Sequence, residues 1–141
     1  MHHLSIRTGN IHRSMAFYEC LGFAVEERFT TGMTLACWLA GPAGRLELIQ
    51  VPLPRPAADA FGDEHYVGYY HLSLEVAEPL TAVLERLGAA LAAHDQPLDV
   101  LLPPQRQTIG PQTYEIAFIR DPDGLPLEFL YPLGPAGGGH G

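Results

Sequence analysis

The chain has 141 residues and a formal net charge of −8, with eight Lys and Arg residues against sixteen Asp and Glu. This length suits a single domain, and the acidic balance argues against nucleic acid and anionic membrane surfaces as partners. No apolar run reaches the ~18 residues that cross a bilayer, so we expect a cytoplasmic protein without a membrane span, in which Cys20 and Cys37 stay reduced.

The first half of the chain predicts the order strand, helix, strand, strand, strand. Residues 3–8 read as a strand, and Asn10 suits the N-cap of a helix that ends at Gly22. Turn residues separate the segments that follow. These predict three further strands, at residues 23–29, 34–39 and 46–51.

The second half repeats much of this order. Residues 70–76 read as a strand, and Pro79 suits the first position of a helix that ends at Gly88. Two strands are predicted to close this half, at residues 114–119 and 125–131. Two segments compete for the remaining strand, residues 89–93 and 98–102.

Short matching stretches indicate an internal duplication. "HHLSIR" at residues 2–7 is answered by "YHLSLE" at 70–75, and each half closes with a strand that carries a glutamate. The extra residues of the second half fall in a Pro-rich loop between 95 and 112. Neither half is large enough to bury its sheet alone. We therefore predict one α+β domain of two βαβββ modules, with module 1 at about 1–51, a connector at 52–69, module 2 at about 70–132 and a disordered tail at 133–141.

Each half begins with a histidine on a strand and ends with a glutamate on a strand: His3 and Glu47, then His71 and Glu128. A carboxylate among apolar strand residues is costly unless its charge is compensated. Two imidazoles and two carboxylates that converge on a divalent cation would compensate it. This mixed nitrogen and oxygen set suits Zn, Ni, Mn or Fe.

Other polar residues are weaker candidates for a site. His2 is expected to point to the face of its strand opposite to that of His3, and His140 lies in the Gly-rich tail. Residues 63–65, Asp-Glu-His, could form a different metal site, but the connector around them has no regular spacing. "DPDG" at 121–124 lacks the alternating ligands of a calcium loop, so a tight turn is the better interpretation.

Four stretches together resemble the vicinal oxygen chelate superfamily and, within it, glyoxalase I (lactoylglutathione lyase). They are "HHLSIRTGNIHRSMAFYECLGF", "LELIQ", "YYHLSLEV" and "FIRDPDGLPLEF", and the resemblance spans about residues 2–132. It implies that two βαβββ modules form a U-shaped sheet around one metal, held by two side chains from each module. The matching positions are His3, Glu47, His71 and Glu128. The resemblance also implies a homodimer, because small members often build each metal site from two chains.

The resemblance further implies a reaction. A glyoxalase I abstracts a proton α to a carbonyl and stabilises the enediolate with its metal, acting on the hemithioacetal of methylglyoxal and glutathione. Glu128 is then the expected catalytic base, with Glu47 as the candidate on the opposite side, and Arg7 falls where the family binds a substrate carboxylate. The family's asparagine after the first glutamate is missing, with Gln50 and Val51 in its place. The co-substrate is therefore left open as glutathione or another thiol.

Two other functions remain compatible with the sequence. An Fe(II) dioxygenase of the extradiol type would need only His3, His71 and Glu128. A superfamily member that is not an enzyme would instead sequester a small drug or metabolite, as bleomycin resistance proteins do. The fourth potential ligand, Glu47, favours the glyoxalase type.

Overall fold

The computed structural model describes residues 1–42 and 44–137, and it contains the two predicted modules. Module 1 comprises β1 (Leu4–Thr8), α1 (Ile11–Cys20), β2 (Ala24–Thr31), β3 (Thr34–Gly41) and β4 (Gly44–Gln50). Module 2 comprises β5 (Leu72–Glu75), α2 (Leu80–Ala92), β6 (Val100–Ile109), β7 (Gln112–Arg120) and β8 (Pro126–Pro135). No helix in these two ranges is both long and apolar enough to cross a bilayer.

The two modules have the same sheet topology. The strand orders are β1-β4-β3-β2 and β5-β8-β7-β6, and in each sheet the first pair is parallel while the others are antiparallel. The register also repeats, since Ser5 lies opposite Glu47 and Ser73 lies opposite Glu128. The predicted α+β fold of two βαβββ modules is confirmed. Within the described part of the chain, the two sheets are not hydrogen-bonded to each other.

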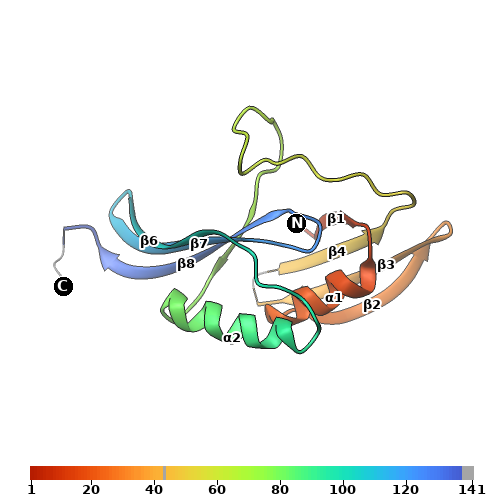
Figure 1. The fold of residues 1–141 in the computed structure, drawn as a ribbon, viewed down its shortest axis with the longest axis horizontal. Coiled ribbons are helices and arrows are strands. Elements are labelled where there is room, and N and C mark those ends of the chain that lie inside the picture. The colour runs from red at the N-terminus through yellow and green to blue at the C-terminus, as the bar shows by residue number, and fades with distance from the viewer. Residues whose placement is uncertain (43, 138–141) are drawn as a thin grey trace.

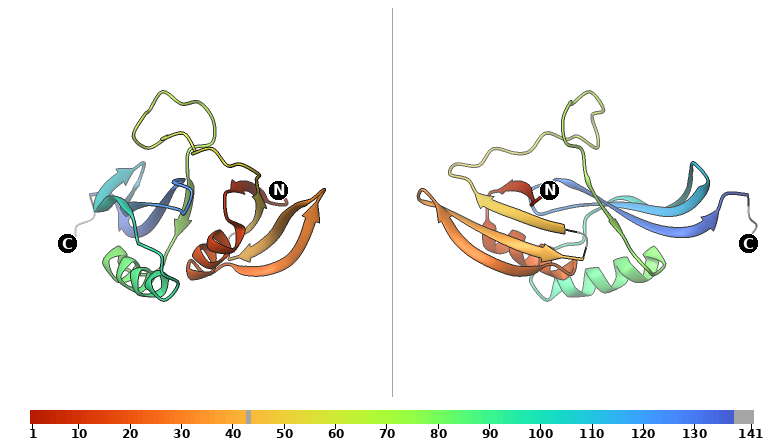
Figure 2. Two further views of the ribbon diagram at one scale, coloured as in Figure 1. Left: turned by 45° about the vertical axis from the view of Figure 1, so that its right-hand side comes forward. Right: turned by 180° about the vertical axis from the view of Figure 1, so that it is seen from behind.

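The helices join the modules into one body. Figures 1 and 2 show α1 and α2 side by side under the two sheets, with the connector arching over the opposite side. The buried apolar residues of both modules form a single cluster, to which α1 contributes Phe17 and α2 contributes Leu87. Because this core is shared, each module needs the other to bury the apolar face of its sheet.

The β7–β8 turn of module 2 is bonded to module 1. The Tyr18 hydroxyl of α1 donates to Asp121 Oδ2 at 2.7 Å, while Thr8 Oγ1 and Gly9 N donate to Asp123 at 2.6 and 3.0 Å. The turn itself is tight, because Gly124 N donates to Asp121 O at 3.0 Å and Gly124 has a φ of +90°. The turn predicted for residues 121–124 is confirmed, and its two aspartates fix one module against the other.

The ends of α1 follow the sequence prediction, but the end of α2 does not. Asn10 Oδ1 accepts from Arg13 N at 3.1 Å as the N-cap of α1, and Gly22 follows the helix with a φ of +98°. In contrast, α2 passes through Gly88 and ends at Ala92. The apolar stripe of the helix continues to Leu91, which is fully buried, and this burial outweighs the low helix propensity of one glycine.

The region around 95–112 is largely a strand, where the sequence favoured a Pro-rich loop. The missing strand of module 2 is β6, which overlaps the candidate at 98–102 and excludes the one at 89–93. Its two prolines lie where the pairing with β7 shifts, between Leu102 and Gln105. A bulge on an edge strand tolerates proline, because no ladder hydrogen bond is needed there. At the other end of the module, β8 extends to Pro135, past the point where a disordered tail was expected to begin.

Candidate functional site

Three neighbouring strands of module 1 bring His3 and Glu47 together. His3 immediately precedes β1, Glu47 lies on β4, and His3 Nε2 is 3.4 Å from Glu47 Oε1. Ser5 Oγ donates to the same oxygen at 2.8 Å, and Trp38 Nε1 on β3 donates to the other carboxylate oxygen at 3.0 Å. Both oxygens of Glu47 are therefore fixed by the protein.

Module 2 repeats this arrangement with one difference. His71 Nε2 lies 3.4 Å from Glu128 Oε1, and Ser73 Oγ donates to that oxygen at 2.8 Å. The side chains of the two glutamates are both 14% exposed. The position opposite Glu128 on β7 is Phe118, where module 1 has Trp38 opposite Glu47. Phe118 has no N–H to donate, so among the described residues Ser73 alone donates a side-chain hydrogen bond to Glu128, at one of its two oxygens.

The extra hydrogen bond affects the ionisation of Glu47. Burial raises the pKa of this carboxyl, but the hydrogen bonds from Trp38 and Ser5, together with the nearby His3, outweigh burial and place the pKa below its usual value. Glu47 is thus a carboxylate over the whole neutral range, the form that binds a cation.

His2 does not point away from His3 as the sequence suggested. It precedes β1, so strand alternation does not govern it, and its ring centroid lies 5.1 Å from that of His3 and 4.9 Å from that of Trp38. His2 Nδ1 approaches His3 Nδ1 at 2.8 Å. The expected orientation of His2 was therefore wrong, and Trp38 was not among the predicted site residues although it pairs with Glu47 across β3 and β4.

The separation within each pair suits two donors on one cation. Nitrogen and oxygen ligands bonded at about 2.1 Å to a tetrahedral or octahedral ion lie roughly 3.0–3.4 Å apart, and each His–Glu pair is separated by 3.4 Å. The residues present therefore fit a divalent metal. We call the His3–Ser5–Glu47 and His71–Ser73–Glu128 sets the two half-sites.

The half-sites do not meet within one chain. Across residues 1–42 and 44–137, no three His, Cys, Asp or Glu side chains are close enough to hold a metal ion together. Residues 63–65 therefore do not form the alternative metal site either. His140 lies outside the described residues. The convergence of His3, Glu47, His71 and Glu128 on one cation stays a prediction, and a single chain does not supply it.

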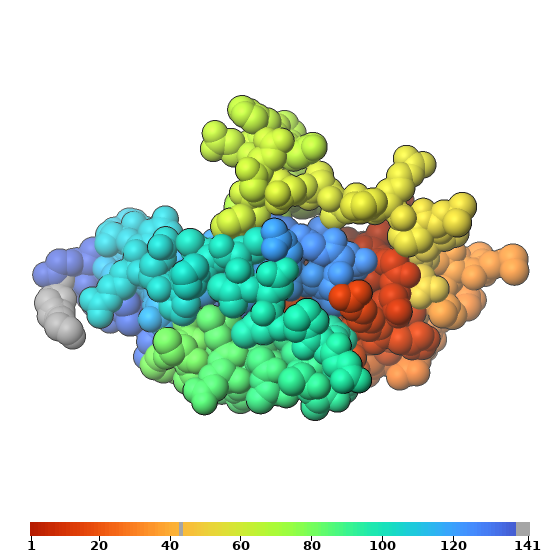
Figure 3. Space-filling view, in the orientation of Figure 1, coloured from red at the N-terminus to blue at the C-terminus, as the bar shows by residue number. Residues whose placement is uncertain are grey.

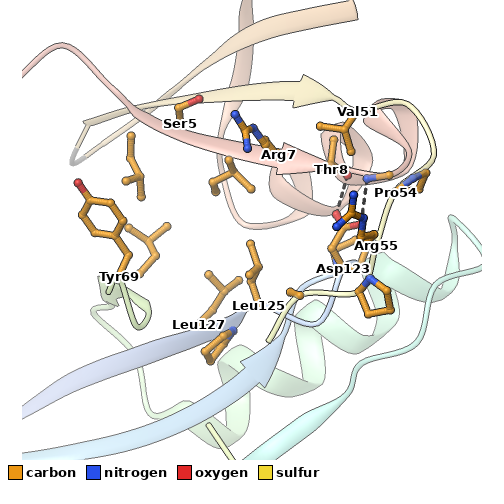
Figure 4. A pocket seen from close by; sticks show the side chains of 18 of the residues that line it. Ser5, Arg7, Thr8, Val51, Pro54, Arg55, Tyr69, Asp123, Leu125 and Leu127 are labelled. Atoms are coloured by element: carbon orange, nitrogen blue, oxygen red, sulfur yellow. Dashed lines mark hydrogen bonds between the residues drawn. The ribbon is translucent and has the colours of Figure 1, made fainter. Parts of the chain in front are cut away.

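A large cavity lies between the two modules. It has a volume of about 1090 Å³ and is lined by β1, the start of the connector, the segment that leads into β5, and the β7–β8 turn. Arg7, the predicted substrate-binding residue, lines this cavity together with Ser5 and His71, one residue from each half-site. Figure 4 shows Arg55 of the connector on one side of the cavity and Tyr69 on the other, with Leu125 and Leu127 below. No sequence pattern pointed to Arg55, because the connector has no periodicity.

Comparison with known proteins agrees with this fold. A family model described as the Glyoxalase/Bleomycin resistance protein/Dioxygenase superfamily matches residues 1–129, whereas no curated protein matches the sequence. A glyoxalase family protein from Enterococcus faecalis superposes with a TM-score of 0.68 at 23% identity, covering 92% of this chain and 95% of that one. A trypanothione-dependent glyoxalase I from Leishmania major gives a TM-score of 0.60 at 25% identity, covering 93% of this chain and 85% of that one.

Proposed function

Because the chain belongs to the Glyoxalase/Bleomycin resistance protein/Dioxygenase superfamily, we propose that it is a metal-dependent lyase or isomerase of the glyoxalase I type. Its proposed substrate is the hemithioacetal formed by a 2-oxoaldehyde, such as methylglyoxal, and a thiol. The observation that carries this proposal is the pair of half-sites, each with a histidine and a serine-bonded glutamate at the same separation. Each half-site places one nitrogen and one oxygen ligand at a spacing that one divalent cation can bridge.

We propose that His3 and Glu47 of one chain and His71 and Glu128 of a second chain hold one metal in a homodimer. Two protein ligands on an exposed sheet face hold a divalent ion weakly, whereas four fill most of its coordination sphere. When bound, the metal supplies a Lewis acid for the negative charge that develops on the substrate oxygens after proton loss. A two-fold dimer would form two such sites from identical contacts.

Glu128 is the proposed base, because its carboxylate is the less constrained of the two. Ser73 holds one of its oxygens, and no side-chain donor in the described residues occupies the other. A base has to turn towards the carbon acid and accept its proton, then return the proton to the neighbouring carbon. Glu47, held at both oxygens by Ser5 and Trp38, is better suited to remain a fixed ligand.

A reconstituted assay tests this proposal. Metal-free protein is loaded with Ni, Zn, Mn or Fe(II) and assayed for thioester formation from methylglyoxal with glutathione and with other thiols. We expect turnover with at least one metal and one thiol, and its loss on chelation. We also expect Glu128→Gln to abolish turnover while the variant remains folded. Full activity of this variant would remove Glu128 from the mechanism.

Two controls separate the competing functions. Iron-dependent consumption of dioxygen with a catechol, without thioester formation, would indicate a dioxygenase instead. Elemental analysis of protein purified without added metal tests the binding-protein alternative. Less than one bound metal ion per chain would contradict a catalytic metal. Sedimentation of metal-free and metal-loaded protein then determines whether the metal-loaded form is a dimer, as the shared site requires.

A further inference from the structure

We propose that His2 is a positioning residue of the first half-site. Its Nδ1 accepts a hydrogen bond from His3 Nδ1 and thereby leaves His3 Nε2, on the side of Glu47, free to bind a metal. The part of this inference that concerns the metal rests on the function proposed above. The hydrogen bond itself does not, so it can be tested in the metal-free protein.

The two imidazoles share one hydrogen. His2 Nδ1 lies 2.8 Å from His3 Nδ1, so one nitrogen carries the hydrogen and the other accepts it, because two N–H groups at this distance repel each other. The other ring nitrogen of His3, Nε2, lies 3.4 Å from Glu47 Oε1. A metal-binding imidazole offers the lone pair of a neutral nitrogen. Ligation through Nε2 therefore requires the hydrogen to reside on His3 Nδ1, with His2 as its acceptor.

An acceptor at this place is what a metal-binding histidine usually has. Such a histidine donates its second N–H to a neighbouring group, which fixes the tautomer and the orientation of the ring. Within the described part of the chain, the hydrogen bond of the His3 side chain is the one with His2. His2 therefore takes the place that a carboxylate or a backbone carbonyl has in other metal sites.

His2 is exposed, yet both its backbone and its ring are held. Arg45 Nη1 donates to His2 O at 3.2 Å, and Arg45 Nε in turn donates to Glu26 Oε1 at 2.8 Å. The His2 ring lies edge-on to the ring of Trp38, with their centroids 4.9 Å apart and their planes at 66°. A residue held at these two points can present one nitrogen to His3 in a fixed direction.

The contacts of His2 lie within module 1. The space-filling view shows the connector lying across the top of the two modules (Figure 3). Within the described residues, however, the hydrogen bonds and ring contacts of His2 are with His3, Trp38 and Arg45. His2 is also not among the residues that line the cavity. A substitution of His2 should therefore affect the His3 ring and leave the connector and the cavity unchanged.

Module 2 has a different residue at the equivalent position. Tyr70 precedes His71, and the centroids of their rings lie 4.6 Å apart in an edge-on contact. The Tyr70 ring also stacks on Phe118, at a centroid distance of 6.3 Å. Among the described residues, the contact between Tyr70 and His71 is one of rings, without a hydrogen bond. Tyr70→Phe is therefore the matched control, because it changes the residue before the second histidine and removes no hydrogen bond to it.

Nuclear magnetic resonance of the ¹⁵N-labelled full chain tests the hydrogen bond directly. A scalar coupling between His2 Nδ1 and His3 Nδ1 passes through the shared hydrogen, and we expect it in the metal-free protein. In the zinc-loaded protein we expect the hydrogen on His3 Nδ1. Absence of the coupling, or a hydrogen that resides on His2 Nδ1 in the zinc-loaded protein, overturns the inference.

Two variants separate the hydrogen bond from ring packing. His2→Phe keeps a ring beside Trp38 but has no acceptor, whereas His2→Asn lacks the ring but places an amide oxygen near the position of Nδ1. Zinc affinity, measured by competition with a chromophoric chelator, should fall about 10-fold in His2→Phe, as is typical when the partner of a metal ligand is lost. It should stay near the wild-type value in His2→Asn and in Tyr70→Phe.

The outcomes distinguish this inference from the proposed function. An unchanged affinity in His2→Phe, or a loss of the same size in His2→Asn or Tyr70→Phe, overturns the role of the hydrogen bond even if the wild type binds zinc and is active. If the wild type binds no zinc, the proposed function fails, and the coupling between the two imidazoles still decides whether His2 holds His3.

Discussion

Replacing Trp38 by phenylalanine would give module 1 the residue that module 2 has at the same position. The substitution removes the 3.0 Å hydrogen bond from the indole N–H to Glu47 Oε2. It keeps an aromatic ring in contact with Phe29 and His2, whose centroids lie 5.3 and 4.9 Å from that of Trp38. The change therefore tests the hydrogen bond with little loss of packing.

The magnitude follows from the kind of hydrogen bond that is lost. A hydrogen bond to a charged group contributes about 1.5–3 kcal/mol, and loss of a residue that orients a metal ligand typically costs about 10–100-fold in metal affinity. The Glu47 side chain is only 14% exposed, so water replaces the indole N–H incompletely. We expect Trp38→Phe to weaken metal binding by about 10-fold, near the lower end of this range because the hydrogen bond from Ser5 remains.

Competition with a chromophoric chelator measures this affinity without a tryptophan signal, which the variant lacks. Phe29→Leu is the matched control, because it removes the ring that packs on Trp38 but leaves the hydrogen bond to Glu47. Metal affinity should fall in Trp38→Phe and stay near the wild-type value in Phe29→Leu. Equal losses in both variants would show that packing, and not the hydrogen bond, fixes Glu47. An unchanged affinity in Trp38→Phe would refute a role for the indole.

Two further predictions concern the serines and the inter-module turn. Ser73→Ala removes the side-chain hydrogen bond that Glu128 has within the described part of the chain, whereas Ser5→Ala leaves Glu47 bonded to Trp38. We therefore expect kcat to fall more in Ser73→Ala, by about 10-fold, and equal effects of the two variants would contradict the asymmetry. Burial raises the pKa of Asp121 in the folded protein above its unfolded value, despite the hydrogen bond from Tyr18. Protonated Asp121 therefore contributes stability below the unfolded pKa, and the wild type loses this contribution as pH rises through the folded pKa, whereas asparagine does not titrate. The free energy of unfolding of Asp121→Asn relative to the wild type should rise between pH 4 and pH 7 in urea titrations, and a constant difference would refute this account.

The parts of the fold that sequence predicted well are those fixed by local signals. The N-cap at Asn10, the glycine after α1 and the turn at 121–124 each depend on a few adjacent residues, and all three are present. The repeat of His-Leu-Ser identified the two strands that carry the half-sites, because the duplication makes the same local structure occur twice.

The parts that sequence predicted poorly depend on partners distant in the chain. Gly88 is a helix stop by propensity, but Leu91 beyond it is buried in a core that only the folded protein supplies. The prolines of β6 indicate a loop until pairing with β7 provides a bulge for them. Arg55 carries no pattern of its own, and its place beside the cavity depends on the contact of Pro54 with Gly9.

The difference between the half-sites is the least visible feature in the sequence and the one with the greatest consequence for the chemistry. A duplicated module supplies two equivalent carboxylates, whereas the function proposed above assigns one of them as a fixed ligand and the other as a mobile base. Under that proposal, the exchange of an indole for a phenyl ring, Trp38 against Phe118, provides the distinction, because the indole donates to Glu47 and the phenyl ring has no N–H to donate to Glu128. Identical backbones can therefore present the same residue in two different roles, and the side chain on the neighbouring strand decides between them.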